Sequence, residues 1–166
     1  LIELAVILQA TKRLGCSLLR TAQKNVVCAD MNPVDLQKLG RLPPGYSGSG
    51  IVVQNTRRFE SGMRVVFLTM NGGGWSEYVV VDDRAVALVP DNVSLCDAAT
   101  VPLAGCTAYE SLDKLVLHHD IKELLIVGGA GGVGSWATRL ARTRNPQMEI
   151  ICTASSDESK AWCQRM

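Results

Sequence analysis

The chain has 166 residues, of which 47% are hydrophobic and 20% charged, so it is long enough to bury one core or two small ones. Its formal net charge is +1, and the basic residues are scattered along the chain. This excludes the strongly basic surface typical of proteins that bind nucleic acid or anionic membranes. The apolar runs are too short to span a bilayer, and the first ten residues lack the basic start of a signal peptide. We therefore expect a globular, cytoplasmic protein with neither nucleic acid nor a membrane as a partner.

The six cysteines are never two or three residues apart, so they lack the spacing of a zinc cluster or a disulfide framework. Most of them lie inside apolar segments. We expect them to be small buried residues that stay reduced. They are Cys16, Cys28, Cys96, Cys106, Cys152 and Cys163.

The first half of the chain predicts a small β-barrel or sandwich. Residues 1–22 fit either a strand or a helix, and no chemistry is assigned to them. A short helix is predicted after Asn32, which can serve as its N-cap, with Pro33 at the first helical position and an end near Gly40. Residues 85–90 are expected to be a connection. The predicted strands are residues 25–29, 51–53, 63–68 and 75–81, with a glycine turn at 71–74 between the last two.

Helical patterns begin after residue 92. Ser94 with Asp97 three residues later forms a weak capping box. Pro102 is expected to start a longer helix. Its apolar face is predicted to hold Leu103, Cys106, Tyr109, Leu112 and Val116.

A glycine-rich stretch follows and carries the clearest chemical signal. The apolar run 124–127 is short enough for a strand covered on both faces, and helical periodicity starts at Val133. Five glycines lie within the seven residues that follow the run: Gly128, Gly129, Gly131, Gly132 and Gly134. Such a turn lets bare backbone N–H groups at a helix N-terminus approach a diphosphate. The stretch therefore predicts a dinucleotide site; the alternative is a plain glycine-rich connection.

The next strand, residues 149–154, bears on which dinucleotide is preferred. An NAD-binding unit places a carboxylate at the tip of this strand to hold the ribose 2′-hydroxyl. Here the tip carries Ser155 and Ser156, and the first acid is Asp157. We therefore favour NADPH over NADH, with Lys160 supplying positive charge. The alternative is that Ser155 and Glu158 form a capping box that needs no ligand.

From about residue 25 onward the chain resembles the medium-chain dehydrogenase/reductase superfamily, in its quinone-oxidoreductase-like branch, which is often labelled zinc-binding alcohol dehydrogenase. The resemblance implies a fold of the α/β plus β class. A GroES-like β-barrel domain would comprise residues 1–92, and part of a Rossmann domain would comprise residues 93–166. Four stretches carry this resemblance in the family's order: residues 31–35, 74–81, 99–109 and 127–134.

The resemblance also implies roles for individual residues. Asn32 would lie near the nicotinamide and Thr107 would line the cofactor cleft. Tyr46 would be the nearest hydroxyl donor to that cleft, although a tyrosine in a turn is more often simply packed. The diphosphate would bind at Gly128, Gly131, Gly132, Val133 and Gly134, and the 2′-phosphate at Ser155, Ser156 and Lys160.

The chain departs from the zinc-dependent members of the family. They carry a cysteine after the first strand and a Gly-His-Glu turn, which here reads Gly45-Tyr-Ser-Gly48, and the four-cysteine structural zinc lobe is missing too. We therefore predict no zinc. The predicted reaction is direct hydride transfer from NADPH to a quinone or an α,β-unsaturated carbonyl compound.

The sequence ends inside the helix after the second Rossmann strand, so we expect a truncated reductase whose own activity is in question, and a homodimer if the protein is full length. Two alternatives stay open. One is an enoyl-thioester reductase, which would need a tyrosine that acts as the general acid where the chain has Gly40-Arg-Leu42. The other is a non-catalytic remnant that keeps the nucleotide turn.

Overall fold

The structure is a computed structural model that describes residues 5–9, 28–38, 40–116 and 121–166. It divides into two compact units, Leu1–Leu103 and Ala104–Met166, which are described separately below. Most of the unassigned N-terminal stretch and of the strand predicted at residues 25–29 lies outside the described residues. The domain boundary expected after residue 92 stays a prediction.

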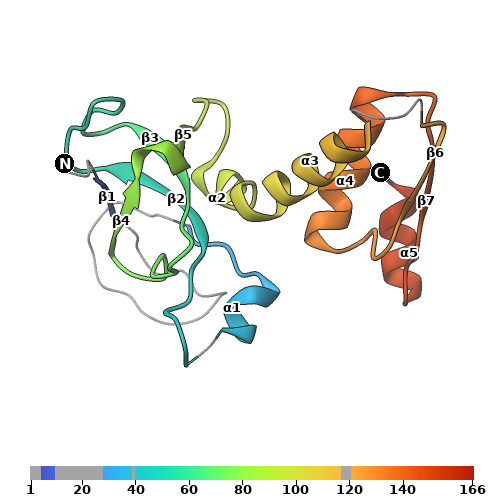
Figure 1. Cartoon of the computed structure of the whole chain (residues 1–166), viewed down its shortest axis with the longest axis horizontal. Helices are drawn as coiled ribbons and strands as arrows, with labels where there is room; N and C mark the ends of the chain where they lie inside the picture. The colour runs from blue at the N-terminus through green and yellow to red at the C-terminus, as the bar shows by residue number, and fades with distance from the viewer. Residues whose placement is uncertain (1–4, 10–27, 39, 117–120) are drawn as a thin grey trace. The chain divides into compact units, whose positions relative to one another are not determined.

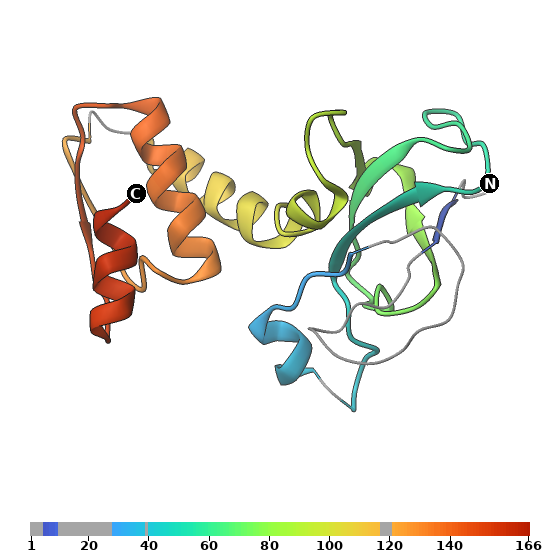
Figure 2. The ribbon, with the colours of Figure 1, turned by 180° about the vertical axis from the view of Figure 1, so that it is seen from behind.

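The first unit is built on a five-stranded antiparallel sheet (Figure 1). Figure 2 shows β2 and β3 running beside one another in this sheet, where Ser49 pairs with Val66. The spatial order is β4-β1-β2-β3-β5. The strands are β1 (Ala5–Gln9), β2 (Ser47–Val52), β3 (Arg64–Leu68), β4 (Tyr78–Asp82) and β5 (Val86–Leu88).

The core of this unit lies on one face of the sheet because its strands alternate apolar and polar environments. In β4, Val79 and Val81 are buried, whereas Tyr78 and Val80 between them are exposed. This is the period of two that a strand with one covered face produces. The buried cluster comprises Val52, Phe59, Val65, Phe67, Val79, Val81 and Val86.

Two strand predictions need correction. β2 begins at Ser47, because its glycine and serine residues 47–50 pair with β3 before the apolar run that the sequence pattern recognises. The expected connection at 85–90 instead contains β5, which pairs with β3. A single 3-10 turn (Asp83–Ala85) precedes it, and the Asp82 side chain caps that turn by accepting a hydrogen bond from the Arg84 N–H.

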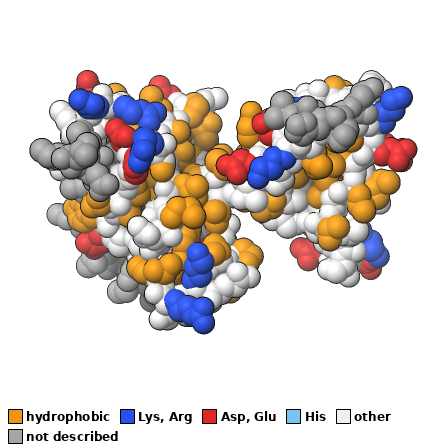
Figure 3. Space-filling model, viewed as in Figure 1, with side chains coloured by type: hydrophobic (Ala, Val, Ile, Leu, Met, Phe, Trp, Pro, Cys, Tyr) orange, Lys and Arg blue, Asp and Glu red, His pale blue; other side chains and the backbone are white. Residues whose placement is uncertain are grey.

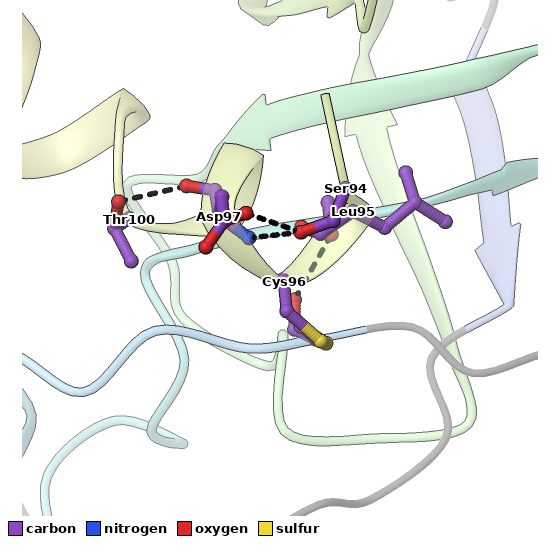
Figure 4. The surroundings of a disulfide bond; sticks show 7 residues. Ser94, Leu95, Cys96, Asp97 and Thr100 are labelled. Carbon is purple, nitrogen blue, oxygen red and sulfur yellow. Dashed lines mark hydrogen bonds between the residues drawn. A yellow bond between two sulfur atoms is a disulfide. The ribbon is translucent and has the colours of Figure 1, made fainter. Parts of the chain in front are cut away.

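Two short helices of the first unit begin where the sequence predicts. Helix α1 (Pro33–Gln37) has Asn32 at its N-cap position and Pro33 in its first turn. Helix α2 (Leu95–Ala99) is capped by the Ser94 hydroxyl, which accepts from the Asp97 N–H at 3.0 Å (Figure 4).

The expectation that the cysteines form no disulfide is wrong for one pair. Cys28 and Cys96 are disulfide-bonded although they lie 68 residues apart in the sequence (Figure 4). The packing of α2 against β2 brings them together, since Ser49 in β2 donates its N–H to the Cys28 carbonyl and its hydroxyl to the Leu95 carbonyl. Spacing along the chain could not reveal this contact.

The second unit is a parallel pair of strands joined through a helix. Strands β6 (Glu123–Ile126) and β7 (Glu149–Cys152) pair in parallel, with Leu125 opposite Ile151 (Figure 1). Helix α4 (Gly132–Arg144) connects them, helix α3 (Pro102–Val116) precedes β6, and helix α5 (Asp157–Gln164) follows β7. Their shared core comprises Leu112, Leu124, Ile126, Ala141 and Met148.

Two packing predictions for this unit are wrong. The longer helix starts at Pro102 and buries Leu112 as predicted, but Cys106 and Tyr109 are exposed. Ala104 and Ala108 are buried instead. The Tyr109 ring instead faces the Arg144 guanidinium, 4.6 Å from the ring centroid. Strand β6 buries Leu124 and exposes Leu125, so only one face of the strand pair is covered in this structure.

Acidic and basic side chains are interspersed on the face shown in Figure 3. Among the described residues, no helix combines the length and apolarity that crossing a membrane would need. The same residues contain no group of three or more His, Cys, Asp or Glu side chains placed to hold a metal ion.

Candidate functional site

The glycine-rich stretch forms a tight turn between β6 and α4. Gly128 has a φ of +71°, a left-handed backbone conformation that glycine adopts without strain. The predicted need for positive φ in this turn is thus confirmed at Gly128. The turn is tied to the end of β7, because the Gly128 N–H donates to the Thr153 hydroxyl at 2.9 Å and the Gly129 N–H to the Thr153 carbonyl at 3.1 Å.

These bonds define which amides of the turn are available to a ligand. The Gly131 N–H donates to the Gly128 carbonyl at 2.9 Å, and the first bond of α4 runs from the Ser135 N–H to the Gly131 carbonyl. The N–H groups of Gly132, Val133 and Gly134 precede that bond, so they have no acceptor within the helix. Gly132 and Val133 are exposed, whereas Gly134 is buried, so the first two amides are open to a ligand. At the positive end of a helix dipole they are suited to binding an anion such as a diphosphate.

Gly129, Gly131 and Gly134 have the spacing of a dinucleotide-binding turn, and the structure gives each a distinct environment. A Cβ on Gly134 would stand 2.2 Å from the Gly128 carbonyl oxygen, so glycine is needed there for the helix to pack against the turn. A Cβ on Gly131 would meet only that same oxygen, at 3.2 Å. A Cβ on Gly132 would make one ordinary contact, 3.6 Å from the Ala104 methyl group.

The residues expected at the 2′-phosphate lie at the start of α5 and are exposed. The Ser156 hydroxyl caps the helix by accepting from the Ser159 N–H at 3.2 Å, so the alternative of a Ser155–Glu158 capping box is wrong. Ser155 therefore remains outside the cap. Lys160 lies 3.0 Å from the Asp157 carboxylate in an exposed ion pair.

Thr107, predicted to line the cofactor cleft, lies on α3 with its side chain exposed. Its carbonyl oxygen accepts a hydrogen bond from the Ser111 hydroxyl at 2.7 Å. Its role, like those of the glycine turn and the serines, remains a prediction.

In the first unit, Asn32 is held in a polar network. Its side-chain amide donates to the Asp30 carboxylate at 3.0 Å and to the Ser47 hydroxyl at 3.4 Å. Burial raises the pKa of Asp30, and hydrogen bonds from the Asn32 amide and the Met31 N–H partly offset this. The network orients the Asn32 amide and places it beside Ser47, the residue that follows Tyr46.

Tyr46 is 4% exposed, and its hydroxyl oxygen has no hydrogen-bond partner in the described part of the chain. The Lys38 ammonium lies 5.0 Å from the centre of its ring. A buried hydroxyl without a partner costs stability, so such a group calls for a ligand or another explanation.

Sequence reasoning missed Asp35 and Thr153. The Asp35 side chain is buried and accepts from the Asn32 N–H at 2.8 Å and the Gly45 N–H at 2.6 Å, so it fixes the stretches that carry Asn32 and Tyr46. A signal for it was present, because an acid three residues after an N-cap residue is typical of a capping box. Thr153 gave no such signal, since its contacts to the glycine turn exist only after β6 and β7 pair.

The two units thus define a class of protein with a GroES-like β-domain and a partial Rossmann domain that carries an open glycine turn. No family model matches the chain. It is 36% identical over 152 residues to a 2-methylene-furan-3-one reductase from Solanum lycopersicum. The matched region covers 79% of this chain and 39% of the reductase. The chain is 31% identical over 150 residues to a chloroplastic quinone-oxidoreductase homolog from Spinacia oleracea, covering 78% of this chain and 46% of that one.

The solved structures agree with this class. The quinone oxidoreductase from Thermus thermophilus, solved alone and in complex with NADPH, superposes with a TM-score of 0.67 at 24% identity, over 93% of this chain and 46% of that one. The chain belongs to the medium-chain dehydrogenase/reductase superfamily, as its four sequence stretches indicated. It spans less than half the length of the two curated relatives described above.

Proposed function

We propose that this chain contributes the dinucleotide turn and part of the substrate domain of an oxidoreductase that uses NADPH to reduce a quinone or an α,β-unsaturated carbonyl compound. The observation that carries the proposal is the pair of exposed amides at Gly132 and Val133, which have no acceptor within the helix. The names of the relatives, a furanone reductase and a quinone-oxidoreductase homolog, support the substrate class. Bound NADPH would supply a hydride to the acceptor, and a proton would complete the reduction.

The turn is suited to the diphosphate because it offers N–H donors and little side-chain bulk. Gly131 precedes the open amides, and a Cβ there would meet one protein atom, the Gly128 carbonyl oxygen at 3.2 Å. A methyl group there would occupy room that a diphosphate needs to approach the backbone. The turn would thus hold the cofactor by main-chain donors.

This role is tested by titrating the 166-residue chain with NADPH and following the nucleotide fluorescence. We expect a Kd in the micromolar range for the parent chain and at least about tenfold weaker binding for Gly131→Ala, which corresponds to about 1.4 kcal/mol. Gly132→Ala is the matched control for the stability of the turn, and its unfolding free energy should equal that of the parent or exceed it by up to about 1 kcal/mol. Equal NADPH affinity of Gly131→Ala and the parent chain would refute a diphosphate at this turn.

We propose NADPH as the preferred cofactor because the tip of β7 carries serines where an NAD-binding unit has a carboxylate. Ser155 and Ser156 would donate to the 2′-phosphate, and Lys160 would supply charge. Lys160→Ala should weaken NADPH binding about tenfold and leave NADH binding unchanged, because only NADPH carries that phosphate. The matched control is Lys114→Ala, which removes another exposed lysine, on α3 rather than α5. If Lys160→Ala weakens both nucleotides alike, the proposed 2′-phosphate site is wrong.

We propose that Tyr46 is the proton donor and that Asn32 positions the nicotinamide, while Asp30 and Ser47 orient the Asn32 amide. The unpartnered Tyr46 hydroxyl supports this assignment. Tyr46→Phe should reduce turnover about a hundredfold or more and leave NADPH affinity unchanged. It should also raise the unfolding free energy by about 1 kcal/mol, because it removes an unsatisfied buried group. Unchanged turnover with the same gain in stability would leave Tyr46 with a packing role only.

We further propose that the reaction needs no zinc, since the family's zinc ligands are replaced in this sequence. Metal analysis of the purified protein should find less than one zinc per chain, and a chelator should leave turnover unchanged. Assays with a quinone and with an enoyl-thioester distinguish the main proposal from the enoyl-thioester alternative. Nucleotide binding without either reaction would favour the non-catalytic remnant.

A further inference from the structure

Two thiols from separate elements lie against the glycine turn. Cys152 is the last residue of β7, and Cys163 lies on α5. A Cβ built on Gly129 would be 2.7 Å from the Cys152 sulfur and 3.1 Å from the Cys163 sulfur, so both sulfurs border the same point of the turn.

The surroundings make the two thiols unequal. Burial and the neighbouring Cys152 raise the pKa of Cys163, so the Cys163 thiol is protonated at neutral pH. The Cys152 sulfur lies 3.5 Å from the Thr138 hydroxyl, which donates to the Gly134 carbonyl at 2.9 Å. Both cysteines are partly accessible to solvent, and neither belongs to the Cys28–Cys96 disulfide.

We propose that Cys152 and Cys163 form an oxidation site, at which a small-molecule disulfide such as glutathione disulfide converts the two thiols into one protein disulfide that weakens dinucleotide binding. The effect on binding rests on the proposed function of the turn, whereas formation of the disulfide does not. Contact of both sulfurs with Gly129 carries the inference.

The chemistry needs no other reagent. The Cys152 thiolate attacks one sulfur of glutathione disulfide, which forms a mixed disulfide and releases one glutathione thiolate. The Cys163 sulfur then attacks the Cys152 sulfur and releases the second glutathione. The two protons lost by the protein thiols go to the two glutathione thiolates, so two protein thiols are oxidised and one disulfide is reduced.

The new bond would disturb the turn because the two sulfurs, which both border Gly129, must approach to about 2.05 Å of each other. Gly129 lies against both sulfurs, and its N–H is bonded to the Thr153 carbonyl next to Cys152. A shift of Cys152 toward α5 therefore moves the backbone that leads into the open amides of α4. Trp162, next to Cys163, reaches the same region, since its indole N–H donates to the Ser135 hydroxyl at 3.1 Å.

The experiment treats the full chain with glutathione disulfide, blocks the remaining thiols and maps tryptic peptides without reduction. Cleavage after Arg144, Lys160 and Arg165 separates the two cysteines, so the new bond would join peptide 145–160 to peptide 161–165. Cys106 is free and exposed, so it serves as an internal control that should carry only a glutathione adduct. NADPH affinity is measured before and after treatment and again after dithiothreitol.

We expect the joined peptides and a rise in the NADPH Kd of at least about tenfold that dithiothreitol reverses. Cys163→Ser should abolish both effects, whereas Cys106→Ser should retain both. Modified Cys106 without joined peptides would overturn the oxidation site. Joined peptides with unchanged affinity would overturn its effect on the turn. If the reduced chain binds no NADPH, the proposed function fails, and the peptide map alone still decides whether the site exists.

Discussion

Replacing Gly134 with alanine tests the packing that shapes the glycine turn. The new Cβ would stand 2.2 Å from the Gly128 carbonyl oxygen and 2.8 Å from the Gly129 Cα, both of which are backbone atoms. Ordinary contacts begin near 3.4 Å, so the start of α4 must move away from the turn by about 1 Å. Overpacking of this kind costs about 3 kcal/mol, and the better helix propensity of alanine returns about 1 kcal/mol. We expect a net loss of about 2 kcal/mol.

Gly132→Ala is the matched control, because the same chemical change two residues earlier meets only the Ala104 methyl group at 3.6 Å. It should leave the unfolding free energy unchanged or raise it by up to about 1 kcal/mol. Urea unfolding followed by tryptophan fluorescence measures both variants, since Trp136 and Trp162 report on the second unit. If the two variants unfold within about 0.5 kcal/mol of each other, the tight approach of α4 to the turn is wrong.

Two further predictions concern the first unit. Asp35→Ala should lower the unfolding free energy by about 3–5 kcal/mol, because it removes two charge-assisted hydrogen bonds from the N–H groups of Asn32 and Gly45. Asp35→Asn keeps one acceptor, so urea titration should find a smaller loss of unfolding free energy for it. Arg84 hydrogen-bonds to Asp82 and lowers its pKa from 3.8 to about 2, so the stabilisation is present above pH 3.8 and is lost as the pH falls towards 2. In Arg84→Ala, NMR titration should find the pKa of Asp82 above 2 but below 3.8, because the backbone N–H of residue 84 still donates to the Asp82 carboxylate; a value still near 2 would contradict the assignment to the Arg84 side chain.

The local signals in the sequence were reliable where a few neighbouring residues decide the conformation. Asn32 with Pro33, and Ser94 with Asp97, mark the starts of α1 and α2, because an N-cap needs only a side chain and an amide two or three residues away. The glycine turn was found for the same reason. Its helix begins one residue before Val133, the predicted start.

The errors arose where packing decides between faces or joins distant segments. The sequence pattern put Cys106 and Tyr109 inside, but α3 buries its alanines, since small side chains let a helix pack closely. Strand β5 was missed because its three residues are stabilised by pairing with β3. The Cys28–Cys96 disulfide requires α2 to pack near β2, and no spacing rule encodes that contact.

The amino-acid sequence was enough to assign the superfamily, the two kinds of domain and the position of the glycine turn, because these depend on motifs whose residues are close together in the chain. Only the tertiary structure decided which amides stay open, since that depends on Thr153 of the next strand bonding to Gly128 and Gly129. It likewise placed the sulfurs of Cys152 and Cys163 beside the same point of Gly129. Hydrogen bonds and close packing act through space, and they couple residues whose separation in the sequence carries no signal.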